Sequence, residues 1–304
     1  MISFKIITME NKEQVVEELS KNRSPESRVI LHDIMSGLDI DNEGDIEFAV
    51  CVCSGCALVR IFDMGRYMFA FPYEICESAD VHLAIDSVRE YAMREEISLT
   101  FTDVPAEYLS YFRGFRHMDM DAEDEDAESY RVRIKTECEL IDEVPEITRE
   151  RVELSSLRED DIQAYAVLCK DKNVNKYWGY DYTCDVKEPS DSYFFENAMI
   201  EFSSGVSMSM AVRCDGCFAG EAVIYAFDGK GGAEFAIRLL PEWQGGGLGT
   251  ETVRALSQMG KNIGLVKLYS KIMKENKASI SMLKKITDEY KEDDGCVTFT
   301  IYLN

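Results

Sequence analysis

The chain has 304 residues, of which 46% are hydrophobic, and a formal net charge of −24. This length and apolar content suffice for about two globular domains, which excludes a disordered chain. The negative charge would repel nucleic-acid phosphates over most of the surface, so we expect no nucleic-acid partner.

Hydropathy and cysteine usage indicate the compartment in which the protein is expected to occur. No apolar run reaches the roughly 18 residues that a membrane-spanning helix needs, and the first residues lack the basic and apolar regions of a signal peptide. The ten cysteines are scattered along the chain, which favours reduced thiols over a disulfide framework. We therefore expect a cytoplasmic protein with no disulfides and no membrane partner.

Residues 1–140 are predicted to form a first α/β lobe. Its expected elements, in chain order, are a hairpin over 47–62, a strand over 67–73, a helix over 80–96, a strand over 97–103, a helix over 105–112 and, after an acidic tract, a strand over 128–134. The three histidines of the chain, His32, His82 and His117, all fall in this lobe without ligand spacing, so we interpret them as ordinary core or surface residues. The polar stretch "IDEVPEITRE" that follows is predicted to be a linker.

Residues 148–304 are predicted to form a second lobe. A strand and a capped helix over 151–168 lead to a helix over 190–202, strands over 206–214, 217–227 and 233–240, a glycine loop, a helix over 251–264, a strand over 265–272, a helix over 276–286 and a strand over 296–303. The fold class is therefore α/β (α+β), with an antiparallel meander that leads into a strand–loop–helix–strand unit.

Two cysteine pairs, Cys53–Cys56 and Cys214–Cys217, have the spacing of zinc knuckles. Each pair, however, brackets a two-residue turn, Ser-Gly or Asp-Gly, between extended apolar runs. This pattern is typical of a β-hairpin. We therefore expect two hairpins and no metal site.

The loop "QGGGLGT" at 244–250 precedes an amphipathic helix. Bare backbone at a helix start favours left-handed turns or a closely approaching ligand, and the first helical N–H groups can bind an anion. The surrounding residues 230–291 hold eleven Lys and Arg against six Asp and Glu, which makes this segment positive within an acidic chain. A Walker P-loop requires a lysine where Thr250 and Glu251 stand, and a GxGxxG dinucleotide fingerprint does not fit the register.

The pattern that does fit is QxxGxG, with Gln244, Gly247 and Gly249 in register. Together with "NKYWGYDY", "FAGEAVIY" and "KIMKENKASISMLKKI" in the same order, it resembles the GNAT family of acyl-CoA N-acyltransferases, and within it the branch that acetylates ribosomal-protein N-termini and related amines. The resemblance covers about residues 151–286. It implies acetyl-CoA as co-substrate, no metal, and transfer of the acetyl group to a primary amine, either a protein N-terminus or a small amine.

The resemblance also implies which residues bind the coenzyme. Backbone groups near the end of the 233–240 strand would hold the pantetheine arm, and the loop amides would hold the pyrophosphate. The implied residues are Leu239, Leu240, Gln244, Gly245, Gly246, Gly247, Leu248, Gly249, Thr250 and Asn276. For Asn276, a second interpretation as a plain helix cap stays open.

For catalysis, the resemblance implies Glu234 as general base and Ser279, or water, as the proton donor near the thioester sulfur, with Glu221 the next candidate base. Two other interpretations stay open: Glu234 as an ordinary edge or surface carboxylate, and Ser279 as a hydroxyl that only bonds back to its own helix. The tyrosine common in the family would fall at Leu283. That departure leaves a non-catalytic acyl-CoA-binding or scaffold protein as the alternative. The acidic remainder of the surface would attract a cationic amine or merely aid solubility, and both interpretations stay open.

The first lobe itself is similar to a degenerate GNAT lobe, and to domains related to FemX-type aminoacyl transferases. Where a glycine loop would stand, it reads "EICESAD" at 74–80. These carboxylates would repel a pyrophosphate. We therefore expect one coenzyme site per chain, while the oligomeric state stays open.

Overall fold

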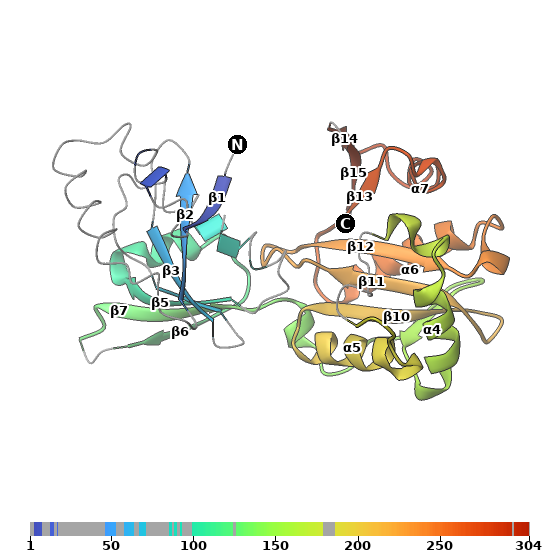
Figure 1. Ribbon diagram of the computed structural model, residues 1–304, viewed down its shortest axis with the longest axis horizontal. Coiled ribbons are helices and arrows are strands. Elements are labelled where there is room, and N and C mark those ends of the chain that lie inside the picture. The colour runs from blue at the N-terminus through green and yellow to red at the C-terminus, as the bar shows by residue number, and fades with distance from the viewer. Residues whose placement is uncertain are drawn as a thin grey trace. The chain divides into compact units, whose positions relative to one another are not determined.

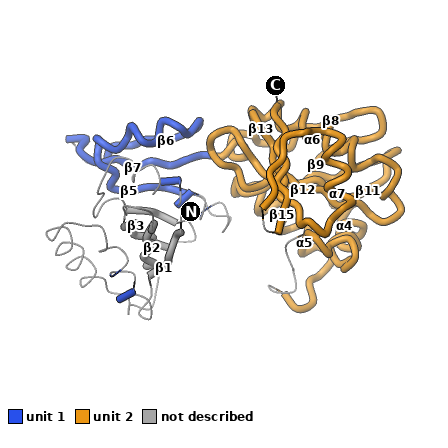
Figure 2. The backbone as a smooth tube through the Cα atoms, turned by 90° about the horizontal axis from the view of Figure 1, so that it is seen from above, with its two compact units in different colours: residues 1–135 blue, residues 136–304 orange. Residues whose placement is uncertain are grey.

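The computed structural model describes residues 3–7, 13–14, 17, 46–52, 58–63, 67–70, 85–86, 88–89, 92, 99–123, 126–178, 186–293 and 295–303. The chain divides into two compact units, Met1–Lys135 and Thr136–Asn304 (Figure 2). Figure 1 labels most of the strands and the helices α4 to α7.

The second unit is a mixed α/β fold. Its strands are β8 (Ile147–Thr148), β9 (Glu153–Ser156), β10 (Ser207–Cys214), β11 (Cys217–Tyr225), β12 (Gly232–Leu239), β13 (Lys267–Met273), β14 (Tyr290–Glu292) and β15 (Cys296–Tyr302). Its α-helices are α4 (Ile162–Lys170), α5 (Asp191–Ser203), α6 (Leu248–Asn262) and α7 (Lys277–Leu283), with a 3₁₀ helix at Val174–Tyr177. The strands form one sheet in the order β14-β15-β13-β12-β11-β10-β9-β8.

One pair of neighbours in this sheet, β12 and β13, is parallel, and all the others are antiparallel. The parallel pairing extends only from Gly232↔Lys267 to Glu234↔Tyr269. Beyond Glu234, β12 continues to Leu239 beside β11, whereas β13 continues beside β15. The two strands therefore diverge, and one edge of β12 is left without a partner strand among the described residues.

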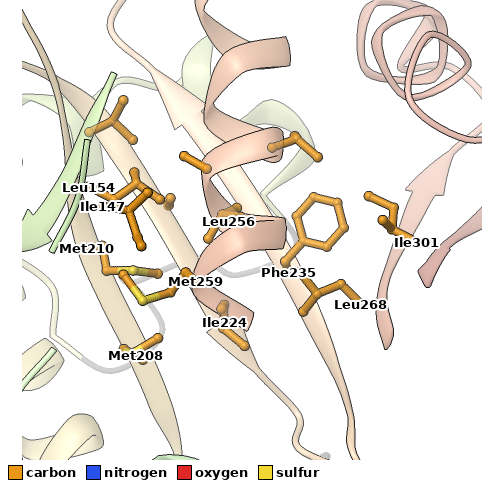
Figure 3. Packing of buried hydrophobic residues seen from close by; sticks show 14 of the residues in the cluster. Ile147, Leu154, Met208, Met210, Ile224, Phe235, Leu256, Met259, Leu268 and Ile301 are labelled. Carbon is orange, nitrogen blue, oxygen red and sulfur yellow. The ribbon is translucent and has the colours of Figure 1, made fainter. Parts of the chain in front are cut away.

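Side chains alternate between the two faces of the sheet, and each face packs against helices. On the face covered by α6, Leu256 and Met259 contact a cluster that includes Ile224 and Phe235 (Figure 3). On the opposite face, Ala211 packs in a cluster supplied by α4 and α5. The helix α5 begins where the Ser190 hydroxyl accepts a hydrogen bond from Tyr193 N (3.2 Å), which is the expected helix start.

The first unit contains β1 (Ser3–Ile7), β2 (Ile46–Val52), β3 (Leu58–Asp63), β4 (Tyr67–Ala70), β5 (Leu99–Pro105), β6 (Met118–Ala122) and β7 (Ser129–Ile134). Their sheet order is β1-β2-β3-β4-β5-β7-β6, and only β4 and β5 are parallel. The seven strands β9-β10-β11-β12-β13-β15-β14 of the second unit have the same order and the same strand directions. The first-unit core includes an edge-to-face pair, Phe101 and Phe112, with ring centroids 5.0 Å apart.

Several predicted elements of the first unit change in the structure. The helix expected over 105–112 is a 3₁₀ helix, Ala106–Phe112, and the acidic tract contributes the unexpected strand β6. Within the helix expected over 80–96, the described helical positions are Ile85, Asp86, Val88, Arg89 and Ala92. The segment 74–80, His32 and His82 lie outside the described residues.

The hairpin prediction is confirmed at the second cysteine pair. Cys214 and Cys217 are opposite each other, and the turn residues Asp215 and Gly216 both have positive φ, 51° and 76°. Two positive φ values are the signature of a type I′ turn, which matches the right-handed twist of the strands. In the first unit β2 and β3 pair as a hairpin, but the turn with Cys53 and Cys56 lies outside the described residues.

Candidate functional site

A pocket of about 540 Å³ opens where β12 and β13 diverge. Four parts of the chain line it: the end of β12, the glycine loop with the start of α6, the residues of α7 and just after it, and the segment that follows α4. Its lining residues are Asn173, Val174, Tyr177, Trp178, Ile237, Arg238, Leu239, Gln244, Gly245, Gly247, Gly249, Thr250, Asn276, Ala278, Ser279, Ser281, Met282 and Lys285.

The glycine loop has a conformation that side chains would disfavour. Gly245 and Gly247 have φ of 78° and 84°, in the left-handed region, and Gly247 is the N-cap of α6. A Cβ placed on Gly245, Gly246 or Gly247 would meet nothing within 4 Å, so the space beside the loop is open. The first N–H groups of a helix have no intrahelical acceptor. An anionic group could therefore occupy this space against the N-terminus of α6.

The backbone of β12 presents alternate residues to the open edge. Leu240 N donates to Ala219 O (2.9 Å), so the backbone groups of Leu240 and Arg238 face β11. Those of Ile237 and Leu239 consequently face the unpaired edge. The Gln244 side chain confirms this direction, because its Nε2 donates to Leu239 O (2.8 Å).

Apart from the second candidate base, Glu221, four of the residues implied for binding or catalysis do not line the pocket. Leu240 packs its side chain against α4 and α5, and its N–H and C=O bond Ala219 and Trp243. Leu248 is buried in the core, and Gly246 turns its carbonyl toward Arg151 Nη1 (3.1 Å). The fourth is Glu234, at the closed end of the divergence.

Helix α7 contributes Asn276 and Ser279 to the pocket. Asn276 is the N-cap, and its Oδ1 accepts from Ser279 N (3.2 Å). The cap uses the side-chain oxygen, and Nδ2 has no acceptor among the described residues. Leu283, where the family tyrosine would stand, is buried in the core at 1% exposure, so this position offers no phenol to the pocket.

Glu234 is the carboxylate nearest in sequence to the divergence of the strands. Burial raises the pKa of its carboxyl group, while a hydrogen bond from Tyr225 and the charge of Lys271 act in the opposite direction. It lies five residues before Leu239, about 16 Å along an extended strand. Any proton transfer between Glu234 and a reacting group near Leu239 therefore requires intervening water or the acceptor itself.

Glu221 is held in a buried ion pair. Both its side chain and that of Arg238 are 2% exposed, and Arg238 Nη2 lies 2.6 Å from Glu221 Oε2. The other carboxylate oxygen accepts a hydrogen bond from the Tyr165 hydroxyl (2.6 Å). Because both oxygens are already engaged by buried side chains, Glu221 is poorly placed to accept a proton from an amine.

Two contributions to the pocket were not foreseen from sequence. Lys285, two residues after the end of α7, supplies the cation that the glycine loop lacks. Tyr177 and Trp178 supply an aromatic wall, and Arg238 stacks on the Trp178 ring with its guanidinium carbon 4.0 Å from the ring centroid. The basic character of 230–291 was a signal for Lys285, and the "NKYWGYDY" stretch was one for the wall.

Among the described residues, no cluster of three or more His, Cys, Asp or Glu could hold a metal ion. None of the described helices has the length and apolar character needed to cross a membrane.

Comparison with known proteins gives one family and several structures. Residues 151–287 match the family described as "Acetyltransferase (GNAT) domain". No curated protein matches the chain. A spermidine N-acetyltransferase from Vibrio cholerae, solved with CoA and spermine, is similar to the chain at 16% identity, over 51% of this chain and 97% of its own, with a TM-score of 0.43.

Two ribosomal-protein acetyltransferases are also similar. RimJ of Mycobacterium smegmatis has 15% identity over 50% of this chain and 81% of its own, with a TM-score of 0.42. A RimL alpha-N-protein acetyltransferase in complex with coenzyme A has 15% identity over 52% of this chain and 98% of its own, with a TM-score of 0.46. The family match carries the assignment: residues 151–287 are a GNAT acetyltransferase domain.

Proposed function

We propose that residues 148–304 transfer the acetyl group of acetyl-CoA to a primary amine, either a protein N-terminus or a small amine, by direct attack on the thioester. The observation that carries the proposal is the convergence of the glycine loop, the unpaired edge of β12 and the start of α7 on one pocket. The glycine loop offers an anion site, the edge of β12 offers backbone groups that can pair with amides, and the start of α7 offers polar side chains.

The chemistry of acetyl-CoA fits these three parts. Its pyrophosphate would lie against the amides of Gly245 and of the start of α6, from Gly247 to Gly249, with the ammonium group of Lys285 nearby. The pantetheine amides would pair with backbone groups of Ile237 and Leu239, as an added strand does. The polar groups of Asn276 and Ser279 would then face the sulfur end of the arm.

Transfer requires a neutral amine, a stabilised oxyanion and a protonated thiolate. In the proposed mechanism Glu234 accepts the amine proton through water, which its raised pKa favours. The amine nitrogen bonds to the carbonyl carbon, and an amide of the β12 edge near Leu239 stabilises the oxyanion. The C–S bond then breaks, and Ser279 or water supplies the proton to the thiolate.

The alternative is a non-catalytic acyl-CoA-binding or scaffold protein. It is favoured by Leu283, since this buried side chain cannot replace the tyrosine found in many relatives. Both functions predict coenzyme binding, but only the enzyme consumes acetyl-CoA when an amine is added.

We propose that the lobe expected over residues 1–140 is a GNAT-like lobe that arose from the same ancestral sheet; the structure ends the first unit at Lys135 and packs Cys138 into the core of the second. The support is the shared order and direction of seven strands. We also propose one coenzyme site per chain, in the second unit, because the carboxylates of "EICESAD" at 74–80 in the first lobe would repel a pyrophosphate.

The decisive test is a reaction of the full chain with acetyl-CoA and a panel of amines, namely spermine, tryptamine and a short peptide with a free N-terminus. Released thiol and acetylated product would be measured together. We expect one member to be acetylated with release of an equal amount of CoA. Coenzyme binding without any acetylated amine would instead support the scaffold.

A further inference from the structure

We infer that Arg238 is a positioning residue for the acceptor side of the pocket: it ties the segment 173–178 to the strand that holds the coenzyme. The geometry of this inference comes from the contacts of Arg238. Its functional consequence rests on the proposed acetyl transfer. It gives a role to the buried charge of β12 that the proposed chemistry does not use.

The contacts of Arg238 join three elements. Its Nε donates to Glu221 Oε2 on β11 (2.7 Å), and its Nη2 donates to Cys169 Sγ at the end of α4 (3.0 Å). Its Nη1 donates to Asn175 Oδ1. Burial raises the pKa of the Cys169 thiol to about 12, so the sulfur accepts this bond as a neutral thiol.

Asn175 links Arg238 to the segment that carries the aromatic wall, Tyr177 and Trp178. Its Nδ2 donates to the carbonyls of Leu168 (2.8 Å), Cys169 (3.0 Å) and Asp171 (2.7 Å), so the side chain closes the turn after α4. Three residues later, the Trp178 ring stacks on the same guanidinium. The Arg238 guanidinium on β12 therefore holds both the turn after α4 and the Trp178 ring.

The location of Arg238 gives this restraint a functional consequence. Its side chain faces α4 and α5, whereas the neighbouring Ile237 and Leu239 point to the α6 face, where the glycine loop lies. A coenzyme bound along the β12 edge therefore leaves the α4 side as the approach for the amine. Tyr177 and Trp178 line that side, and an amine must be placed within about 3–3.5 Å of the carbonyl carbon to react.

Arg238→Lys is the informative variant. Lysine keeps the positive charge beside Glu221 but lacks the planar fork and the stacking surface, so the wall loses its tie while the buried carboxylate keeps a counter-ion. With the amine that gives most product in the panel above, we expect kcat/KM for the amine to fall by about 10- to 100-fold, as for a misplaced reactant. We expect KM for acetyl-CoA to change by less than about twofold, since the pyrophosphate cradle is unaltered.

Arg213→Lys is the matched control. Arg213 is also buried, on β10, which β11 separates from β12, and it forms a bidentate pair with Asp161 (2.9 and 2.6 Å), but it does not line the pocket. Its substitution should lower the melting temperature without changing kcat/KM per folded molecule. A comparable loss of amine kcat/KM in both variants would show that Arg238 acts through general stability, which would overturn the inference.

A second readout does not require turnover. The chain has two tryptophans, so a Trp243→Phe background leaves Trp178 as the sole indole. In that background Arg238→Lys should increase acrylamide quenching of Trp178, because the ring loses the guanidinium that covers one face. Unchanged quenching would show that Arg238 does not hold the Trp178 ring, and would overturn the inference whether or not the activity changes. Conversely, increased quenching in a protein that acetylates no amine would contradict only the proposed function.

Discussion

Gly247→Val gives the sharpest test of the pyrophosphate cradle. The φ of 84° at Gly247 lies in the left-handed region, where an L-residue costs about 1–2 kcal/mol, and a β-branched side chain is especially poorly accommodated there. The variant should therefore move the loop and the first amides of α6. Hydrogen bonds to a charged group contribute about 1.5–3 kcal/mol each, so the loss of two would weaken acetyl-CoA binding by about 100-fold or more.

The assay is the shift in melting temperature that acetyl-CoA produces. At a concentration of about 100 times the wild-type Kd, binding adds about 2.7 kcal/mol to the stability. For a unit the size of residues 136–304, this corresponds to about 5–10 °C. A 100-fold weaker Kd leaves about 0.4 kcal/mol, a shift of only about 1–2 °C.

Gly246→Val is the matched control. Gly246 lies in the same loop, its φ is not positive, a Cβ there meets nothing within 4 Å, and the residue does not line the pocket. We expect it to retain most of the shift. A full shift with Gly247→Val, or an equal loss in both variants, would refute the cradle.

Three further variants test the chemistry. Glu234→Gln should lower kcat at neutral pH by about 10²-fold, with part of the loss recovered at alkaline pH where the amine deprotonates unaided; a normal neutral rate would exclude Glu234. Burial raises the pKa of this carboxyl group, so the wild-type protein loses stability as the pH rises and the buried group ionises. Glutamine cannot ionise, so Glu234→Gln should raise the melting temperature relative to wild type more at neutral than at acidic pH. Equal differences at both pH values would contradict this. Ser279→Ala should lower kcat without alkaline recovery, and recovery would argue against thiolate protonation. Lys285→Ala should raise KM for acetyl-CoA mainly at low salt, and a salt-independent change would exclude a phosphate contact.

Much of the second unit follows from local patterns in the sequence. The alternation in "SMSMAVRC" and the Asp-Gly turn after it predict β10 and the hairpin to β11, and the structure has both. The four glycines before an amphipathic run predict the start of α6 within a few residues. These features depend on residues close in sequence, so the pattern alone carries them.

The features that the sequence does not reveal depend on long-range pairing. The divergence after Glu234 arises because β13 continues beside β15, a strand that lies near the end of the chain. This pairing decides which backbone groups of β12 are exposed, and so separates Leu239 from Leu240. The Glu221–Arg238 pair gave one local signal, a charge at an inward position in each of two apolar strands. Which partners it joins, Asn175 and Trp178 among them, depends on tertiary packing.

The most direct test of the central claim is product mass spectrometry of the full chain incubated with acetyl-CoA labelled in its acetyl group and the amine panel. The account predicts that the label appears on the nitrogen of one amine, in an amount equal to the CoA released, and that Gly247→Val lowers both together. Label that stays on acetyl-CoA while the wild-type protein binds it would contradict the transferase and favour the scaffold.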